Sequence, residues 1–108
     1  MKVSFVLPVV LTLLTASTSA IDCSGSKKCQ IGGCQLSELI RKIPNGKTWK
    51  SGKEIACCEG RGNRLCATAT HAVGDLHSDV VKVLLQELYN YGCRRCGDAY
   101  SLVKVNAY

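Results

Sequence analysis

The residues of this chain whose types and spacing suit chemistry are its eight cysteines, all of which follow residue 20. Cysteines act as half-cystines, metal ligands or redox nucleophiles, and their spacing helps to distinguish these roles. A structural zinc site would need a second close pair besides Cys93-x-x-Cys96, or histidines at ligand spacing. The chain offers only a vicinal pair, Cys57-Cys58, and two histidines six positions apart, His71 and His77. We therefore expect no metal and no other cofactor.

A helix is expected to position Cys93 and Cys96, because apolar residues recur every three or four positions just before them. Ser78 is its expected N-cap and Gly92 its C-terminal residue, with Arg94-Arg95 beside its negative end. A redox Cys-x-x-Cys lies at a helix N-terminus, where the dipole lowers the thiol pKa. These two cysteines follow a C-terminus, which favours structural disulfides. The expected buried face consists of Val80, Val81, Leu84, Leu85, Leu88 and Tyr91.

The N-terminal stretch Met1–Ala20 has the pattern of a secretory signal peptide. Lys2 precedes an apolar run over residues 3–14, and small residues then lead to the expected cleavage after Ala20. The apolar run is too short for a membrane span, so we expect a soluble, secreted product with no membrane insertion. We also expect this product to be a monomer. Residues 21–108 then form one domain with thirteen basic and eight acidic side chains, a net charge of +5.

The remaining elements follow from apolar periodicity and turn residues. They predict an α+β fold, a disulfide-rich two-layer α/β sandwich whose antiparallel sheet carries both helices on one face. The expected elements are a short strand and an irregular segment over 21–34, a helix over 35–43 ended by Pro44-Asn45-Gly46, strands over 53–58 and 64–70 joined by a hairpin loop at 59–63, and a closing strand over 101–108.

Side-chain alternation along the two hairpin strands narrows the possible disulfides. Strict alternation places Ile55 and Cys57 on one face of the first strand and Cys58 on the other. Cys66 lies opposite to the apolar face of the second strand, so it shares the outer face with Cys58. This predicts the pairs Cys34–Cys57 and Cys58–Cys66. Cys23 and Cys29 are then left to pair with Cys93 and Cys96, in an order that spacing does not decide.

Four segments, in order along the chain, resemble a known family. They are Ile21–Cys29, Asn45–Trp49, Asn90–Gly97 and Leu102–Tyr108. Together they resemble the viral killer toxin of the fourth smut-fungus type and its cellular homologues, over nearly the whole mature chain. The resemblance implies an antiparallel sheet with two helices and the pairs Cys23–Cys93 and Cys29–Cys96. It is silent on the other two pairs, because the toxin has ten cysteines.

The resemblance also implies a function. The type member is a secreted toxin that inhibits calcium uptake by blocking voltage-gated calcium channels of competing fungi, and one lysine just before a strand cysteine is credited with the block. In this chain that position falls on Ile55 or Ala56, and the nearest substitute is Lys53. The resemblance therefore supports the predicted fold more directly than it supports a block of calcium channels.

Basic residues in the middle of the chain form the expected target-binding surface. The candidates are Lys47, Trp49, Lys50, Lys53, Arg61 and Arg64. The alternative reading is a solvated loop with a half-buried tryptophan and a charged hairpin. A cationic domain is drawn to acidic vestibules, anionic lipid and polyanions alike, so charge does not identify the partner. We expect no nucleic-acid partner, because no basic stripe is interleaved with aromatic residues.

An enzymatic function would need a catalytic constellation. A small secreted ribonuclease could use His71 and His77 as base and acid, but two histidines of one loop are more often incidental. We therefore expect no enzyme and no catalytic residue. The expected function is that of a killer-toxin-like protein that inhibits target-cell growth by binding a membrane protein, a calcium channel or another component of calcium uptake. The alternative is a secreted effector or inhibitor that binds a protein other than a channel.

Overall fold

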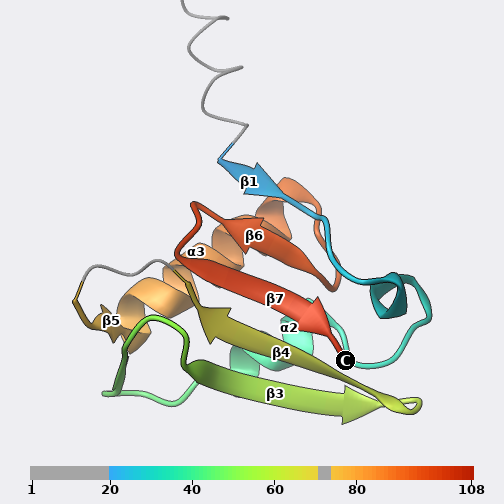
Figure 1. The fold of residues 1–108 in the computed structure, drawn as a ribbon, viewed down its shortest axis with the longest axis horizontal. Helices are drawn as coiled ribbons and strands as arrows, with labels where there is room; N and C mark the ends of the chain where they lie inside the picture. Colours follow the sequence, from blue (N-terminus) through green and yellow to red (C-terminus); the bar gives the residue numbers. More distant parts are fainter. Residues whose placement is uncertain (1–19, 71–73) are drawn as a thin grey trace, which may run out of the picture.

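The computed structural model describes residues 20–70 and 74–108, so the expected signal peptide up to residue 19 and His71 lie outside the described residues. An antiparallel sheet of five strands, in the order β1-β6-β7-β4-β3, carries the helices α2 and α3 on one face (Figure 1). This confirms the α+β fold. The elements are β1 (Ile21–Asp22), the 3-10 helix η1 (Lys27–Gln30), α2 (Leu36–Arg41), β2 (Thr48–Trp49), β3 (Glu54–Gly60), β4 (Asn63–Ala69), β5 (Leu76–His77), α3 (Ser78–Tyr91), β6 (Gly97–Ala99) and β7 (Val103–Ala107).

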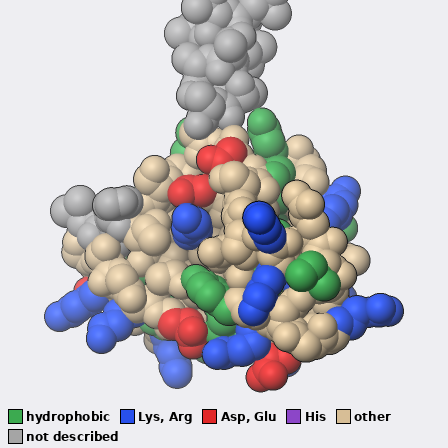
Figure 2. Space-filling view, turned by 45° about the vertical axis from the view of Figure 1, so that its right-hand side comes forward, with side chains coloured by type: hydrophobic (Ala, Val, Ile, Leu, Met, Phe, Trp, Pro, Cys, Tyr) green, Lys and Arg blue, Asp and Glu red, His purple; other side chains and the backbone are tan. Residues whose placement is uncertain are grey.

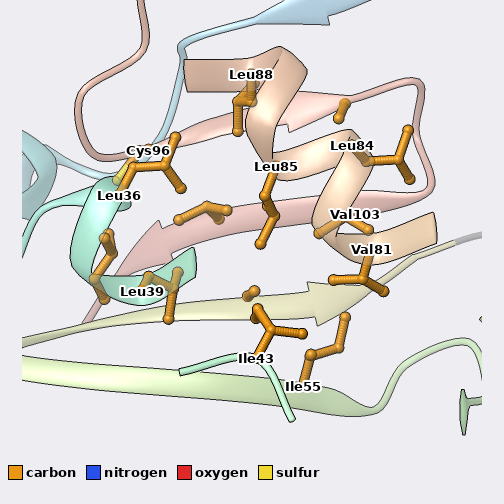
Figure 3. Close-up of a cluster of buried hydrophobic side chains, with 14 of the residues drawn as sticks. Leu36, Leu39, Ile43, Ile55, Val81, Leu84, Leu85, Leu88, Cys96 and Val103 are labelled. Atoms are coloured by element: carbon orange, nitrogen blue, oxygen red, sulfur yellow. The ribbon is translucent and has the colours of Figure 1, made fainter. Parts of the chain in front are cut away.

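Side chains of the helices and of the inner sheet face meet in one core (Figure 3). Four of the predicted helix residues, Val81, Leu84, Leu85 and Leu88, form the buried face of α3. The prediction is wrong for Val80 and Tyr91, which are 44% and 49% exposed. On a helical projection these two residues lie beside the buried stripe on one side, at the border with the exposed face of the helix.

Helix α3 begins one residue earlier than its sequence predicts. His77 is the N-cap, and its Nδ1 accepts a hydrogen bond from the backbone N–H of Asp79 at 3.2 Å. Ser78 is instead the first helical residue and is fully buried. Its hydroxyl oxygen accepts the backbone N–H of Gly46 at 3.0 Å, which ties the α2–β2 loop to the helix.

A β-bulge near the start of β3 overturns two of the predicted disulfides. The pairing of β3 with β4 shifts between Glu54 and Ala56, so Ile55 and Ala56 both pack against the core. Alternation resumes after this extra residue, which turns Cys57 outward and Cys58 inward. The bridges are therefore Cys34–Cys58 and Cys57–Cys66, not Cys34–Cys57 and Cys58–Cys66.

The other two bridges join the N-terminal segment to the end of α3. They are Cys23–Cys93 and Cys29–Cys96, the pairs that the family resemblance implies. Cys93 and Cys96 thus bond to separate partners. All eight cysteines lie in the described residues and none of them is free, which confirms structural bridges in place of a redox pair.

The loop before Cys34 approaches the β3–β4 hairpin so closely that it requires glycine. Gly33 has φ +120°, and a Cβ there would lie 2.7 Å from the carbonyl oxygen of Gly60. Gly33→Ala is therefore expected to lower the free energy of unfolding by about 2–4 kcal/mol. Gly46→Ala, with φ +66° and no atom within 4 Å of the added Cβ, should cost only about 1 kcal/mol. Urea denaturation of both variants checks this, and equal losses would contradict a steric origin.

Candidate functional site

The predicted lysines lie together at one end of the sheet. We call residues 41–53 the basic segment, because it holds five Lys or Arg residues and no acidic residue. Lys47, Lys50 and Lys53 are all exposed, as are Arg41 and Lys42 at the end of α2. Figure 2 shows Lys and Arg side chains most densely along the lower edge of the face drawn, with acidic side chains among them. Neither ion pair found among the described residues includes a lysine of the basic segment.

Backbone hydrogen bonds fix the basic segment between β4 and α3. Gly52 donates its N–H to the carbonyl of Ala69 at 2.7 Å, and Ala69 donates back to Lys53 at 2.9 Å. Ser78 at the start of α3 donates to the carbonyl of Lys47 at 2.8 Å. Strand β2 pairs with β5, and Trp49 packs half-buried against the core. The lysines are therefore presented on a fixed backbone, with the tryptophan as its anchor to the domain.

Of the two predicted arginines, Arg61 does not join this surface, whereas the Arg64 guanidinium reaches its edge. Lys53 directly precedes β3, whereas Arg61 lies in the turn that follows it. A strand of seven residues spans about 20 Å, so the two ends are well separated. Arg64 is turned back along the hairpin, where its Nη2 lies 4.0 Å from Glu54 and 3.3 Å from Cys57 Sγ. The candidate contact surface is thus the basic segment without Arg61, and Arg64 lies at its edge beside Glu54.

The strand position that aligns with the family's lysine is a core position here. Ile55 is 7% exposed and Ala56 packs against the core. A lysine at either position would bury its ammonium group against apolar side chains, which is costly. Lys53, which is exposed just before the strand, is the nearest lysine along the chain.

Only one of the two candidate catalytic histidines, His77, lies in the part of the chain that the structure describes. His77 uses Nδ1 to cap α3, and His71 lies outside the described residues. One open groove of about 510 Å³ lies at the hairpin tip. A second, of about 570 Å³, lies between the N-terminal loop and Cys93–Cys96. His77 lines neither groove. The described histidine therefore has a structural role.

The clearest pKa shifts occur near β1 and β6, at the edge of the sheet opposite to β3. Ser24 donates its hydroxyl and its backbone N–H to the Asp22 carboxylate, and these bonds hold the pKa of Asp22 below its usual value. Tyr100 donates its hydroxyl to Glu87 at 2.9 Å, which raises the pKa of Tyr100. Neither group contacts the basic segment, so these shifts do not mark the candidate site.

Arg95 is a buried residue whose role the sequence does not reveal. Its guanidinium donates to the carbonyls of Cys34, Lys28 and Cys29 at 2.7–2.9 Å, and to the side-chain oxygen of Asn63 at 2.8 Å. Arg94 behaves as predicted for both arginines, because it donates to the Tyr89 carbonyl and stacks on the Tyr89 ring. Nothing in the local pattern distinguishes the two.

The fold and its bridges define a class: small cysteine-rich α+β proteins whose helices and sheet are joined by disulfides, here with an exposed basic segment. The Kp4 family model matches residues 6–104, which is 99 of the 108 residues. The chain therefore belongs to the Kp4 killer-toxin family. No curated protein matches it in a sequence comparison.

Proposed function

We propose that this protein is a secreted inhibitor of target-cell growth, which acts by binding and blocks a calcium channel or another component of calcium uptake. The observation that carries the proposal is membership of the killer-toxin family. The exposed basic segment supports it, because a cationic surface is attracted to the acidic mouth of a cation channel. Four disulfides suit a domain that works outside the cell, where oxidising conditions preserve them.

A binding mode without membrane insertion also fits the described structure. None of the helices in residues 20–70 and 74–108 has the length and apolar character of a membrane span. The basic segment instead offers a rigid surface for a protein partner. Preorganisation of this kind limits the ordering entropy lost on binding.

Charge reversal in the basic segment tests the contact surface. In Lys50→Glu/Lys53→Glu, the charge changes by about four units in an exposed turn, and growth inhibition should weaken by about tenfold or more. The matched control is Lys27→Glu/Lys28→Glu, which makes the same change in exposed η1. Dose–response curves on fungal and plant cells measure the effect. Equal loss in both variants would show that total charge matters and not this surface.

Added calcium separates the channel from other targets. Inhibition through a calcium channel should weaken when external calcium is raised, whereas an equal ionic strength of sodium salt should act only by screening. Sensitivity to Lys50 and Lys53 without calcium rescue would favour the alternative, a protein target other than a channel. A catalytic function predicts instead that His71→Ala or His77→Asn abolishes activity, since Asn preserves the helix cap.

A further inference from the structure

The Cys57–Cys66 bridge differs from the other three in its surroundings. It joins directly opposed residues of β3 and β4 on the sheet face that the helices leave open. Cys57 is partly exposed there. We propose that this bridge is a thiol–disulfide exchange site, which a low-molecular-weight thiol reduces while the other three bridges and the fold remain intact. This inference is independent of the proposed function.

A cation beside the sulfur favours its release as a thiolate. Arg64 directs Nη2 to Cys57 Sγ at 3.3 Å. A nearby positive charge lowers the pKa of a thiol, and a leaving thiol of lower pKa departs faster in exchange. The Glu54 carboxylate opposes this, because its oxygen lies within 4.8 Å of both sulfurs and 4.0 Å from Arg64. The two side chains therefore set the reactivity of the bridge in opposite directions.

The other bridges have sulfurs that face oxygen atoms. Cys34 Sγ lies 3.7 Å from the Glu38 carboxylate. Cys93 Sγ lies 3.7 Å from the Asp22 carbonyl, and Cys29 Sγ lies 3.5 Å from the side-chain oxygen of Asn106. These oxygens can accept a hydrogen bond from a thiol but repel a thiolate. Exposure alone does not single out Cys57–Cys66, since Cys23 is also exposed; the cationic neighbour does.

The hairpin does not depend on this bridge for its pairing. Strands β3 and β4 pair on both sides of it, from Glu54–Thr68 to Gly60–Asn63. Strand β4 also pairs with β7, and Cys34–Cys58 still fastens β3 to the segment that leads into α2. The bridge closes a separation of only nine residues, against 67 and 70 for the bridges to Cys96 and Cys93. Its reduction should therefore leave the fold in place.

The exchange is balanced by two molecules of the small thiol. The first, as its thiolate, bonds to the partly exposed Cys57 Sγ, because Cys66 is only 2% exposed, and the electron pair of the S–S bond leaves on Cys66 Sγ. The second attacks the small-thiol sulfur of this mixed disulfide and releases Cys57 as a thiolate beside Arg64. The products are one small-molecule disulfide and two protein thiols, which take up the two protons that the small thiols lose.

The test exposes the folded protein to reduced glutathione at neutral pH, with samples quenched by an alkylating reagent over time. Tandem mass spectrometry then locates the labels, which is necessary because Cys57 and Cys58 share any peptide. We expect Cys57 and Cys66 to be labelled first, about tenfold or more faster than the other six cysteines. Circular dichroism should show the fold retained at that stage. Earlier or equal labelling of another bridge would overturn the proposal, as would loss of the fold with the first two labels.

Three variants test whether the charges beside the Cys57–Cys66 bridge, and not the total charge of the protein, set its rate of reduction. Arg64→Gln should slow the reduction of Cys57–Cys66 by about three- to tenfold, and Glu54→Gln should accelerate it by about two- to threefold. Arg61→Gln is the matched control, since it removes the same charge from the exposed turn of the same hairpin. A similar slowing in Arg61→Gln and Arg64→Gln, or no change in Arg64→Gln, would refute the role assigned to Arg64.

Discussion

Replacing Arg95 with methionine is expected to lower the free energy of unfolding by about 3–5 kcal/mol. Arg95 is 9% exposed, and its guanidinium serves four acceptors on η1, on the loop at Cys34 and on β4. Methionine fills much of the volume but donates no hydrogen bond, so buried carbonyls and the Asn63 side chain would lose their partners. Denaturant unfolding followed by tryptophan fluorescence and circular dichroism measures the loss.

Two companion variants show whether fork geometry or charge matters. Arg95→Lys retains the charge but not the planar fork that reaches several acceptors, so most of the loss should remain. Arg94→Met removes an exposed arginine from the same turn and should cost about 1 kcal/mol or less. If Arg95→Lys leaves the protein as stable as the wild type, charge alone suffices. Equal costs at residues 94 and 95 would contradict the burial argument.

Removing the Cys23–Cys93 bridge with paired serines is expected to cost about 4 kcal/mol, enough to prevent efficient folding and export. The bridge spans 70 residues and fastens the N-terminal segment to the end of α3. The paired change Cys57→Ser/Cys66→Ser opens a separation of only nine residues and should cost about 1–2 kcal/mol less on the chain-entropy view. Paired substitution avoids a free thiol that could exchange with the other bridges.

Yield in the culture medium and unfolding midpoints of the two double variants provide the comparison. The variant without Cys23–Cys93 should accumulate poorly, whereas the variant without Cys57–Cys66 should be exported and folded. Equal export with equal midpoints would contradict the view that the long-range bridges hold the domain together. A lower yield or midpoint in the variant without Cys57–Cys66 would contradict the claim that the hairpin folds without this bridge.

Elements with strong periodicity could be predicted from the sequence. The four buried residues of α3, the short helix before Pro44, the two hairpin strands and the closing strand each carry enough apolar repetition to identify them. Strands β2, β5 and β6 were not predicted, because two or three residues hold no period. Their pairing depends on partners that are distant in sequence, such as Thr48 with His77. The basic segment could likewise be recognised from its composition. Its separation from Arg61 could not, because it depends on how β3 is placed in the fold.

What the sequence by itself determined is the α+β class, the killer-toxin resemblance and the attachment of Cys93 and Cys96 to the N-terminal segment. The tertiary structure alone decided the other two bridges and the role of Arg95. One extra residue at the β3 bulge reverses the facing of Cys57 and Cys58, and alternation read along one strand contains no sign of a bulge. Arg95 is buried because separate chain segments bring their carbonyl groups to it, an arrangement that exists only after those segments have packed together.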